Sequence, residues 1–354
     1  MAIPQTYLTA LLLLILTMIC WGSWANTLKR TGPKWRYELF YYDFALGVML
    51  TGIIAAITFG SYGSSDITFM DNMSIIRRKQ IAFAAGAGVL FNLANMLLAG
   101  AISIAGISVA FPIGMGVALV TGVLWSFILR PQGNAGLQFA GSGIVVIAII
   151  LTSMAYRLMI RKRELDELQK IATGQAKKKK PLKPSRWKAI VLSLVSGALL
   201  GSSYPLIESA RVDDLEMGAY SIGFVFGIAV FLSTIVFNFF FVNLPVQGQP
   251  VPITAYANIS GKQHLVGVLG GLVWMTGAIA SFAAATAPKE VQVSPAISQA
   301  LGQSACLVGM LWGLLYWKEF ADTPDRARML MGSTVALYLI GLGLISIAPL
   351  YVTK

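Results

Sequence analysis

Long apolar stretches alternate with short polar ones along the whole 354-residue chain. Each apolar stretch has about 20 residues, which is the length that an α-helix needs to cross about 30 Å of hydrocarbon. Lipid offers backbone groups no hydrogen-bond partners, so each stretch must form a helix. The pattern predicts ten membrane-spanning helices, at residues 6–28, 37–59, 80–101, 102–129, 135–154, 188–210, 217–242, 265–287, 291–317 and 328–350.

A basic segment divides the chain into two halves with five predicted spans each. Twelve of the 27 lysines and arginines lie between Arg157 and Lys188. We therefore predict a first five-helix repeat at residues 1–156, a basic linker at 157–187 and a second five-helix repeat at 188–354. The charged stretch at 161–171 is a candidate continuation of the fifth helix beyond the membrane.

The two halves resemble each other in sequence. Gly88 and Phe91 of the third span recur as Gly271 and Trp274 of the eighth, 183 residues later. Because each half has an odd number of spans, the second half must enter the membrane upside down. The predicted fold class is therefore an all-α integral membrane protein made of two inverted five-helix repeats. Inverted repeats place a solute site at their interface, near the middle of the membrane.

The net charge of +12 does not indicate a nucleic-acid partner, because the basic residues are concentrated in one loop. Their distribution predicts a multi-pass protein of the cell (inner) membrane, with both termini outside and the linker in the cytoplasm. The linker at 157–187 also favours contact with anionic lipid. Both cysteines, Cys20 and Cys306, fall inside predicted spans, and the sequence predicts no disulfide framework, metal site or cofactor.

Short motifs are spread over nearly all predicted spans of both halves. They are Gly22-Ser23-Trp24, Tyr42-Asp43-Phe44, Thr58 with Gly60 and Gly63, Asn92-Leu93-Ala94, Gly106-Ile107-Ser108-Val109, Pro245 with Gly248, Pro250 and Ala255-Tyr256, and Val291-Gln292 with Pro295. Together they resemble the plant ureide permeases and, more loosely, the bacterial glucose and rhamnose uptake carriers, all of the drug/metabolite transporter superfamily. The resemblance implies a proton-coupled importer of allantoin, uracil or related oxo-heterocycles.

The chain departs from that family in two places. Plant members have a long central loop with a nucleotide-binding-like motif, whereas this loop is short and the sequence has no GxxxxGK[ST]. Plant members also have an acid in the fourth span where this chain has Phe111. Residues 111–116 look nearer to the sugar carriers, so a sugar carrier and a drug or metabolite exporter stay open as alternatives.

One acidic side chain lies inside a predicted span. Asp43 is six residues into the second span, and an acid within a membrane span is costly and indicates a functional site by default. We predict that Asp43 couples transport to protons. The alternative is a structural salt bridge with Lys29, Arg30 or Arg36 at the cytoplasmic mouth.

Amide and aromatic side chains recur at helical spacing in several spans. Three glutamines at i, i+7 and i+11 share one face of a helix with 100° per residue, and amides suit a solute that has both donors and acceptors. Tryptophan rings suit stacking on a sugar or a flat heterocycle. The predicted solute site consists of Trp21, Trp24, Asn92, Asn95, Trp274, Gln292, Gln299 and Gln303. The alternative for these residues is packing between helices or at the lipid interface.

Other classes of protein fit the sequence less well. An enzyme would need acid–base or metal chemistry, but the sole histidine, His264, lies beside Lys262 in a predicted loop without a carboxylate cluster. A structural protein or receptor would leave the polar stripes and the repeat unexplained. We therefore expect a secondary active transporter that imports a small neutral polar solute, a ureide such as allantoin or a nucleobase, together with protons.

Overall fold

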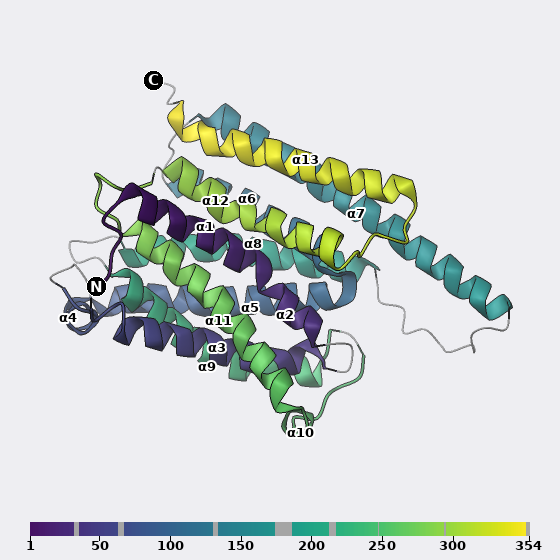
Figure 1. Ribbon diagram of the computed structural model, residues 1–354, viewed down its shortest axis with the longest axis horizontal. Coiled ribbons are helices and arrows are strands. Elements are labelled where there is room, and N and C mark those ends of the chain that lie inside the picture. The colour runs from purple at the N-terminus through teal and green to yellow at the C-terminus, as the bar shows by residue number, and fades with distance from the viewer. Residues whose placement is uncertain are drawn as a thin grey trace.

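The computed structural model is a bundle of long helices that lie roughly side by side (Figure 1). It describes residues 1–31, 35–62, 67–129, 134–173, 186–211, 217–246, 248–293 and 295–351, and all regular structure within these ranges is helical. The first half contains α1 (Tyr7–Ser23), α2 (Ala25–Arg30), α3 (Tyr37–Ile57), α4 (Phe69–Ile75), α5 (Arg78–Ala105), α6 (Ile107–Leu129) and α7 (Ala135–Ala172). The second half contains α8 (Arg186–Arg211), α9 (Ala219–Asn243), α10 (Thr254–Ala257), α11 (Gly261–Ala285), α12 (Pro295–Leu311), a π-helical stretch (Trp312–Tyr316) and α13 (Asp325–Ile347).

Nine helices of the described chain are long and apolar enough to cross a membrane, which makes this a multi-pass membrane protein. One of the nine is Tyr7–Arg30, in which α2 continues α1. The predicted span at 291–317 is wrong at its start, because α12 begins at Pro295. The apolar helix in this part of the chain, Leu301–Tyr316, is shorter than the nine membrane-spanning candidates. Proline lacks an N–H and disfavours helix in the residue before it, so it begins α12. The predicted count of ten spans is therefore not confirmed.

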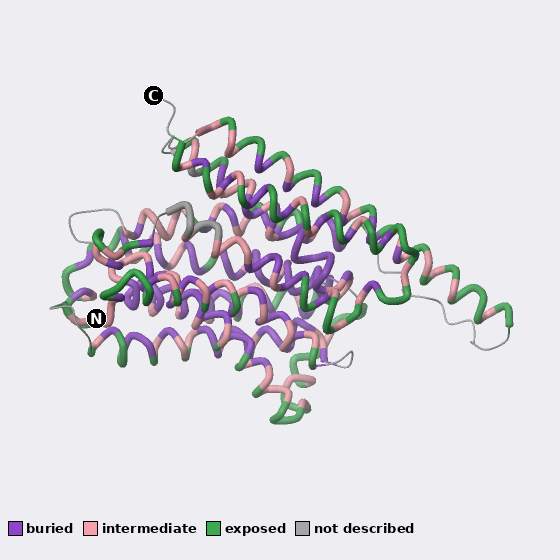
Figure 2. The backbone as a smooth tube through the Cα atoms, turned by 45° about the horizontal axis from the view of Figure 1, so that its top comes forward, coloured by how far each residue is buried: buried purple, intermediate pink, exposed green. Residues whose placement is uncertain are grey.

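The predicted junction of the third and fourth spans is also wrong. The third and fourth spans meet at Gly106, which has a φ of +88°, and not at the predicted turn near residues 100–103. The fifth helix does continue over 161–171, as predicted, so the first half of the proposed linker at 157–187 is helix α7. This end of α7 projects beyond the bundle and is largely exposed (Figures 1 and 2). The run Lys177–Lys180 lies outside the described residues.

The long helices of the two halves follow one packing scheme. Helix α1 packs against α11 and α12 of the second half, and α8 packs against α5 and α6 of the first. Likewise α3 packs against α11, as α9 packs against α5. Helices α3 and α9, α6 and α12, and α7 and α13 contact each other in pairs. The first helix of each half therefore packs against two helices of the other half.

Glycines mark the closest crossings between these helices. A Cβ on Gly271 of α11 would collide with the carbonyl oxygen of Phe44 on α3 and lie 2.7 Å from the amide nitrogen of Val48. In the other half, a Cβ on Gly88 of α5 would lie 2.8 Å from the carbonyl oxygen of Phe226 on α9. Small residues let membrane helices approach until their backbones touch. The buried residues accordingly concentrate in the middle of the bundle (Figure 2).

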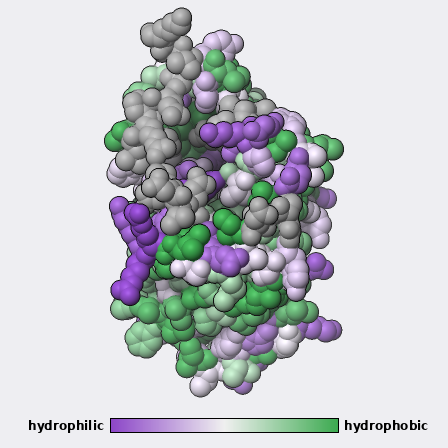
Figure 3. All heavy atoms as spheres, turned by 90° about the vertical axis from the view of Figure 1, so that its left-hand side faces the viewer, coloured by the Kyte–Doolittle hydropathy of each residue, from purple (hydrophilic) through white to green (hydrophobic). Residues whose placement is uncertain are grey.

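The two ends of the bundle differ in what they contain. Both chain termini lie at one end, which we call the terminus end (Figure 1). Helices α2 and α10 and the projecting part of α7 lie at the opposite end, which we call the linker end (Figure 1). The face at the terminus end mixes hydrophilic and hydrophobic side chains (Figure 3), as a surface beyond the hydrocarbon layer allows.

Candidate functional site

Asp43 is enclosed between α3 and the second half of the chain, toward the linker end. The residue is 2% exposed. Its Oδ2 lies 2.9 Å from Nδ1 of His264, the fourth residue of α11, and its Oδ1 accepts a 2.5 Å hydrogen bond from the hydroxyl of Tyr256 in α10. Gly267 of α11 leaves room for the carboxylate, since a Cβ there would lie 2.5 Å from the Asp43 Cβ.

The partners of Asp43 have different access to solvent. The His264 ring stands edge-on to Trp35 and Tyr256, with centroids at 5.6 and 4.6 Å, and its side chain is 28% exposed. Burial, followed by the hydrogen bond and the charge of Asp43, raises the pKa of Tyr256, so its phenol stays protonated and donates to the carboxylate.

The predicted alternative for Asp43, a salt bridge with a basic residue near the mouth, is wrong for two of the three candidates. Lys29 pairs with Glu319, and Arg36 pairs with Glu38 at 2.5 Å. The partner that sequence reasoning missed is His264, which lies in the first turn of α11 and not in a loop. The described residues contain no cluster of three histidine, cysteine, aspartate or glutamate side chains that could hold a metal ion.

Four aromatic rings from four helices meet halfway along the bundle. Trp274 stacks on Phe91 at a centroid distance of 4.1 Å, on Phe226 at 5.8 Å and on Trp21 at 6.0 Å. Phe91 and Trp274 are the counterparts that the repeat predicts, and here they face each other across the two halves. We call Trp21, Phe91, Phe226 and Trp274 the aromatic cluster. Trp24 lies apart from it and packs against the rings of Phe44 and Phe111, at 5.0 and 6.4 Å.

One polar atom in the aromatic cluster is unsatisfied. The indole nitrogen of Trp21 is buried and has no hydrogen-bond acceptor in the described chain. A buried donor without a partner costs about 1–3 kcal/mol. This nitrogen is therefore a natural place for an acceptor atom of a bound molecule.

The predicted asparagines make contacts between helices. The Asn92 amide of α5 donates to α9, to the Ser233 and Thr234 hydroxyl oxygens at 2.8 and 2.9 Å. The Asn95 amide donates to the Tyr41 hydroxyl of α3 at 3.1 Å. Both contacts fit the packing alternative, and a role of these amides in solute binding stays a prediction.

Only two of the three predicted glutamines, Gln299 and Gln303, lie in helix α12. Gln292 lies ahead of α12, is exposed, and donates to the carbonyl oxygen of Ala285 at 3.2 Å near the terminus end. Its shared face with Gln303 is therefore wrong, because α12 begins only at Pro295. Gln303 is half-buried within α12. The side chain of Gln299 lies outside the described part of the chain, so its role stays a prediction.

Comparison with known proteins finds permeases. A family model described as "Ureide permease" matches residues 40–190. "Ureide permease 1" of Arabidopsis thaliana is 23% identical over an alignment that covers 95% of this chain and 96% of the relative. By sequence, this chain is similar to the ureide permeases. "Ureide permease 2" of the same plant is 22% identical, over 92% of each chain, and "Probable ureide permease A3" of Vigna unguiculata is 25% identical over 40% of this chain.

This relationship decides between the broad classes of function. The ureide permeases are membrane transporters and not enzymes, and this ureide-permease-like chain has the apolar helices of such a transporter. The prediction of a membrane transporter is thereby confirmed, whereas secondary active transport stays a prediction. The broader likeness to the drug/metabolite superfamily and to the glucose and rhamnose carriers stays a prediction.

Proposed function

We propose that this chain is a proton-coupled carrier that imports a small neutral solute of the ureide type. The observation that carries the proposal is the similarity, along nearly the whole chain, to proteins named ureide permeases. Ureides have carbonyl acceptors and N–H donors on a small uncharged frame. Such a solute needs a site that combines apolar surface with a few hydrogen-bonding groups.

The aromatic cluster is the proposed solute site. Its rings supply flat apolar faces without formal charge. An aromatic side chain that is fully covered buries about 150–250 Å² of surface. The free indole N–H of Trp21 supplies a donor for a solute carbonyl. A neutral solute loses its water on entry and must replace those hydrogen bonds, so a buried donor beside ring faces favours ureides and nucleobases over carboxylates and cations.

The packing scheme supports two inverted repeats. The first-half helices α1, α3, α5, α6 and α7 correspond in order to α8, α9, α11, α12 and α13 of the second half. When each helix is replaced by its counterpart, most of the major helix–helix contacts are reproduced. The aromatic counterparts Phe91 and Trp274 stack where the halves meet. In carriers built from inverted repeats, the solute site lies at the repeat interface near the midplane, and the contact of the aromatic cluster with both halves supports the proposal.

Asp43 with His264 is the proposed coupling pair. In a low-dielectric site a carboxylate and an imidazole that share one proton are together neutral, whereas loss of that proton leaves one buried negative charge. The two groups come from different halves of the chain, α3 and α11. Binding or release of the proton therefore changes how strongly the halves attract each other, which is what proton coupling requires.

Replacing Trp21 with phenylalanine is expected to raise the apparent KM for the solute by about tenfold, because it removes the indole donor and keeps a ring. The measurement is uptake of radiolabelled allantoin by cells that express the variant, normalised to protein in the membrane. Trp125→Phe is the matched control, since Trp125 of α6 is exposed and donates to Ser202. An unchanged KM in Trp21→Phe would exclude this donor from the solute site.

The proposed orientation has both termini outside and the linker end in the cytoplasm. Gln169 is exposed on the projecting part of α7, and Tyr351 is exposed at the terminus end. A cysteine at position 351 is expected to react with an impermeant maleimide in intact cells, and a cysteine at 169 only after permeabilisation. The reverse labelling pattern would show that the protein has the opposite orientation in the membrane. The basic linker end would then no longer face the anionic lipid of the cytoplasmic leaflet, which we propose as its lipid partner.

A further inference from the structure

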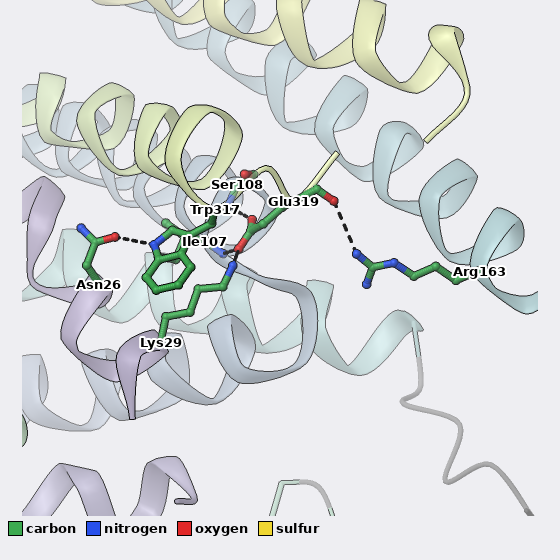
Figure 4. A network of polar contacts seen from close by, with 7 residues as sticks. All are labelled: Asn26, Lys29, Ile107, Ser108, Arg163, Trp317 and Glu319. Carbon is green, nitrogen blue, oxygen red and sulfur yellow. Dashed lines mark hydrogen bonds and ion pairs between the residues drawn. The ribbon is translucent and has the colours of Figure 1, made fainter. Parts of the chain in front are cut away.

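A carboxylate is held at the start of α6, near the linker end (Figure 4). Glu319 lies after the π-helical stretch, in the connection to α13, and its side chain is 7% exposed. Its Oε1 and Oε2 accept hydrogen bonds from the backbone N–H groups of Ile107 and Ser108, at 3.0 and 2.7 Å. The ammonium group of Lys29 in α2 forms an ion pair with the same carboxylate. We call these three interactions the Glu319 latch.

The backbone around the latch fits the carboxylate closely. Gly106 has a φ of +88°, which lets the chain turn directly from α5 into α6 and leaves the first N–H groups of α6 open. A Cβ on Gly106 would lie 2.6 Å from Oε1 of Glu319. The N-terminus of a long helix attracts a negative charge through its free N–H groups and its dipole.

Further contacts surround the latch (Figure 4). The indole nitrogen of Trp317 donates to Oδ1 of Asn26 at 2.7 Å, and the Lys29 ammonium lies 5.0 Å from the centre of the Trp317 ring. Arg163, on the projecting part of α7, donates to the Glu319 backbone oxygen at 3.4 Å. The latch and the Arg163 hydrogen bond together tie α2, α6 and α7 of the first half to the α12–α13 connection of the second.

Its position singles the latch out among the ion pairs of the described residues. Pairs such as Arg36–Glu38, Arg211–Glu208 and Arg328–Asp325 each lie within one half of the chain. Among the ion pairs that lysine and arginine form with carboxylates in the described residues, Lys29–Glu319 joins the two halves. A few residues deeper in the bundle, Trp24 and Phe111 pack against each other across α1 and α6.

We propose that the Glu319 latch is the gate that closes the linker end of the solute path and opens in every transport cycle. The inference rests on the transporter class and is independent of which solute or coupling ion is used. A carrier must separate its halves at one end while the other stays shut. Water entering at the linker end can replace both partners of Glu319, so the latch can open without leaving a buried charge unpaired.

The first test is hydrogen–deuterium exchange of the purified protein without any solute. Lys29→Met is expected to speed exchange by about tenfold or more, both in its own segment 24–30 and in the first turns of α6, because it leaves the carboxylate of Glu319, which is 7% exposed, without its counter-charge and so favours the open state. Glu319→Gln is expected to speed exchange in the same two segments.

Lys29→Met also separates a gate from a helix cap, since the described contacts of the Lys29 ammonium are with Glu319 and the Trp317 ring, whereas the α6 N–H groups are capped by Glu319. If Glu319 only caps α6, Lys29→Met will leave exchange in α6 unchanged, and that result would overturn the proposal. Arg328→Gln is the matched control, because it removes an exposed ion pair within α13 and is expected to leave both segments as they are.

The second test links the gate to transport. In a chain with Cys20 and Cys306 replaced by alanine, Lys29→Cys and Glu319→Cys are joined by a reducible bifunctional thiol reagent. Joining them is expected to stop solute exchange, and reduction is expected to restore it to its level before joining. The control pair is Asp325→Cys with Arg328→Cys on one helix. Full exchange through the joined chain would show that the linker end does not open at this point, and would leave the solute and coupling proposals intact.

Discussion

Asp43→Asn is expected to abolish solute accumulation driven by a pH gradient while solute exchange across the membrane continues. A gradient of about one pH unit can accumulate a neutral solute about tenfold when one proton enters with it. Asparagine keeps the size of Asp43 and one acceptor oxygen for the Tyr256 hydroxyl, but it cannot take up a proton, so accumulation should fall to equal concentrations on both sides. The measurement is uptake into proteoliposomes with an imposed pH gradient, alongside counterflow without one.

The coupling experiment has a matched control and a second variant. Asp325→Asn changes an exposed acid at the start of α13 and is expected to accumulate solute as the unmodified chain does. His264→Gln removes the imidazole that contacts Asp43 and is expected to weaken accumulation less than Asp43→Asn. Accumulation by Asp43→Asn at the unmodified level would mean that Asp43 is structural.

Gly271→Ala is expected to destabilise the bundle strongly. The new Cβ would strike the Phe44 carbonyl oxygen and approach the Val48 nitrogen to 2.7 Å, and backbone atoms cannot move aside as a flexible side chain can. Overpacking typically costs about 1–3 kcal/mol, and here α3 and α11 must separate over their whole crossing. The free energy of unfolding in mixed micelles measures the loss.

Gly343→Ala is the matched control for this change. Gly343 lies in α13, and a Cβ there would meet no atom within 4 Å. Alanine is a better helix former than glycine by about 1 kcal/mol, so this variant should be as stable as the unmodified chain or slightly more so. Equal stability of Gly271→Ala and Gly343→Ala would contradict the close crossing of α3 and α11.

The sequence predicted most helices of the fold because membrane spans are read from hydropathy alone. It failed where a boundary depends on a single backbone group. Pro295 begins α12 where the hydropathy pattern predicted a longer helix, and this error also placed Gln292 on the same helical face as Gln303. Gly106 ends α5 where the apolar pattern is unbroken. Hydropathy carries no information about such points, which are set by proline chemistry and by a positive φ.

The candidate site was predicted only in part, because its partners come from distant segments. Asp43 was visible as an acid within a span, but His264 is 221 residues away in the sequence. One signal could have found it, since the predicted topology already placed the start of the eighth span at the same end of the membrane as Asp43. Trp21 and Trp274 were predicted as site residues and do stack on each other, whereas Glu319 had no signal in the sequence.

The exchange of first helices between the halves has a consequence for how the protein is made. Helix α8 fills the space between α5 and α6, and α1 fills the corresponding space between α11 and α12. When the ribosome has completed only residues 1–173, α5 and α6 therefore lack the neighbour that covers them, and α1 lacks the surface on which it rests. The newly inserted first half must wait in the membrane for α8, so biogenesis completes both halves together rather than one after the other.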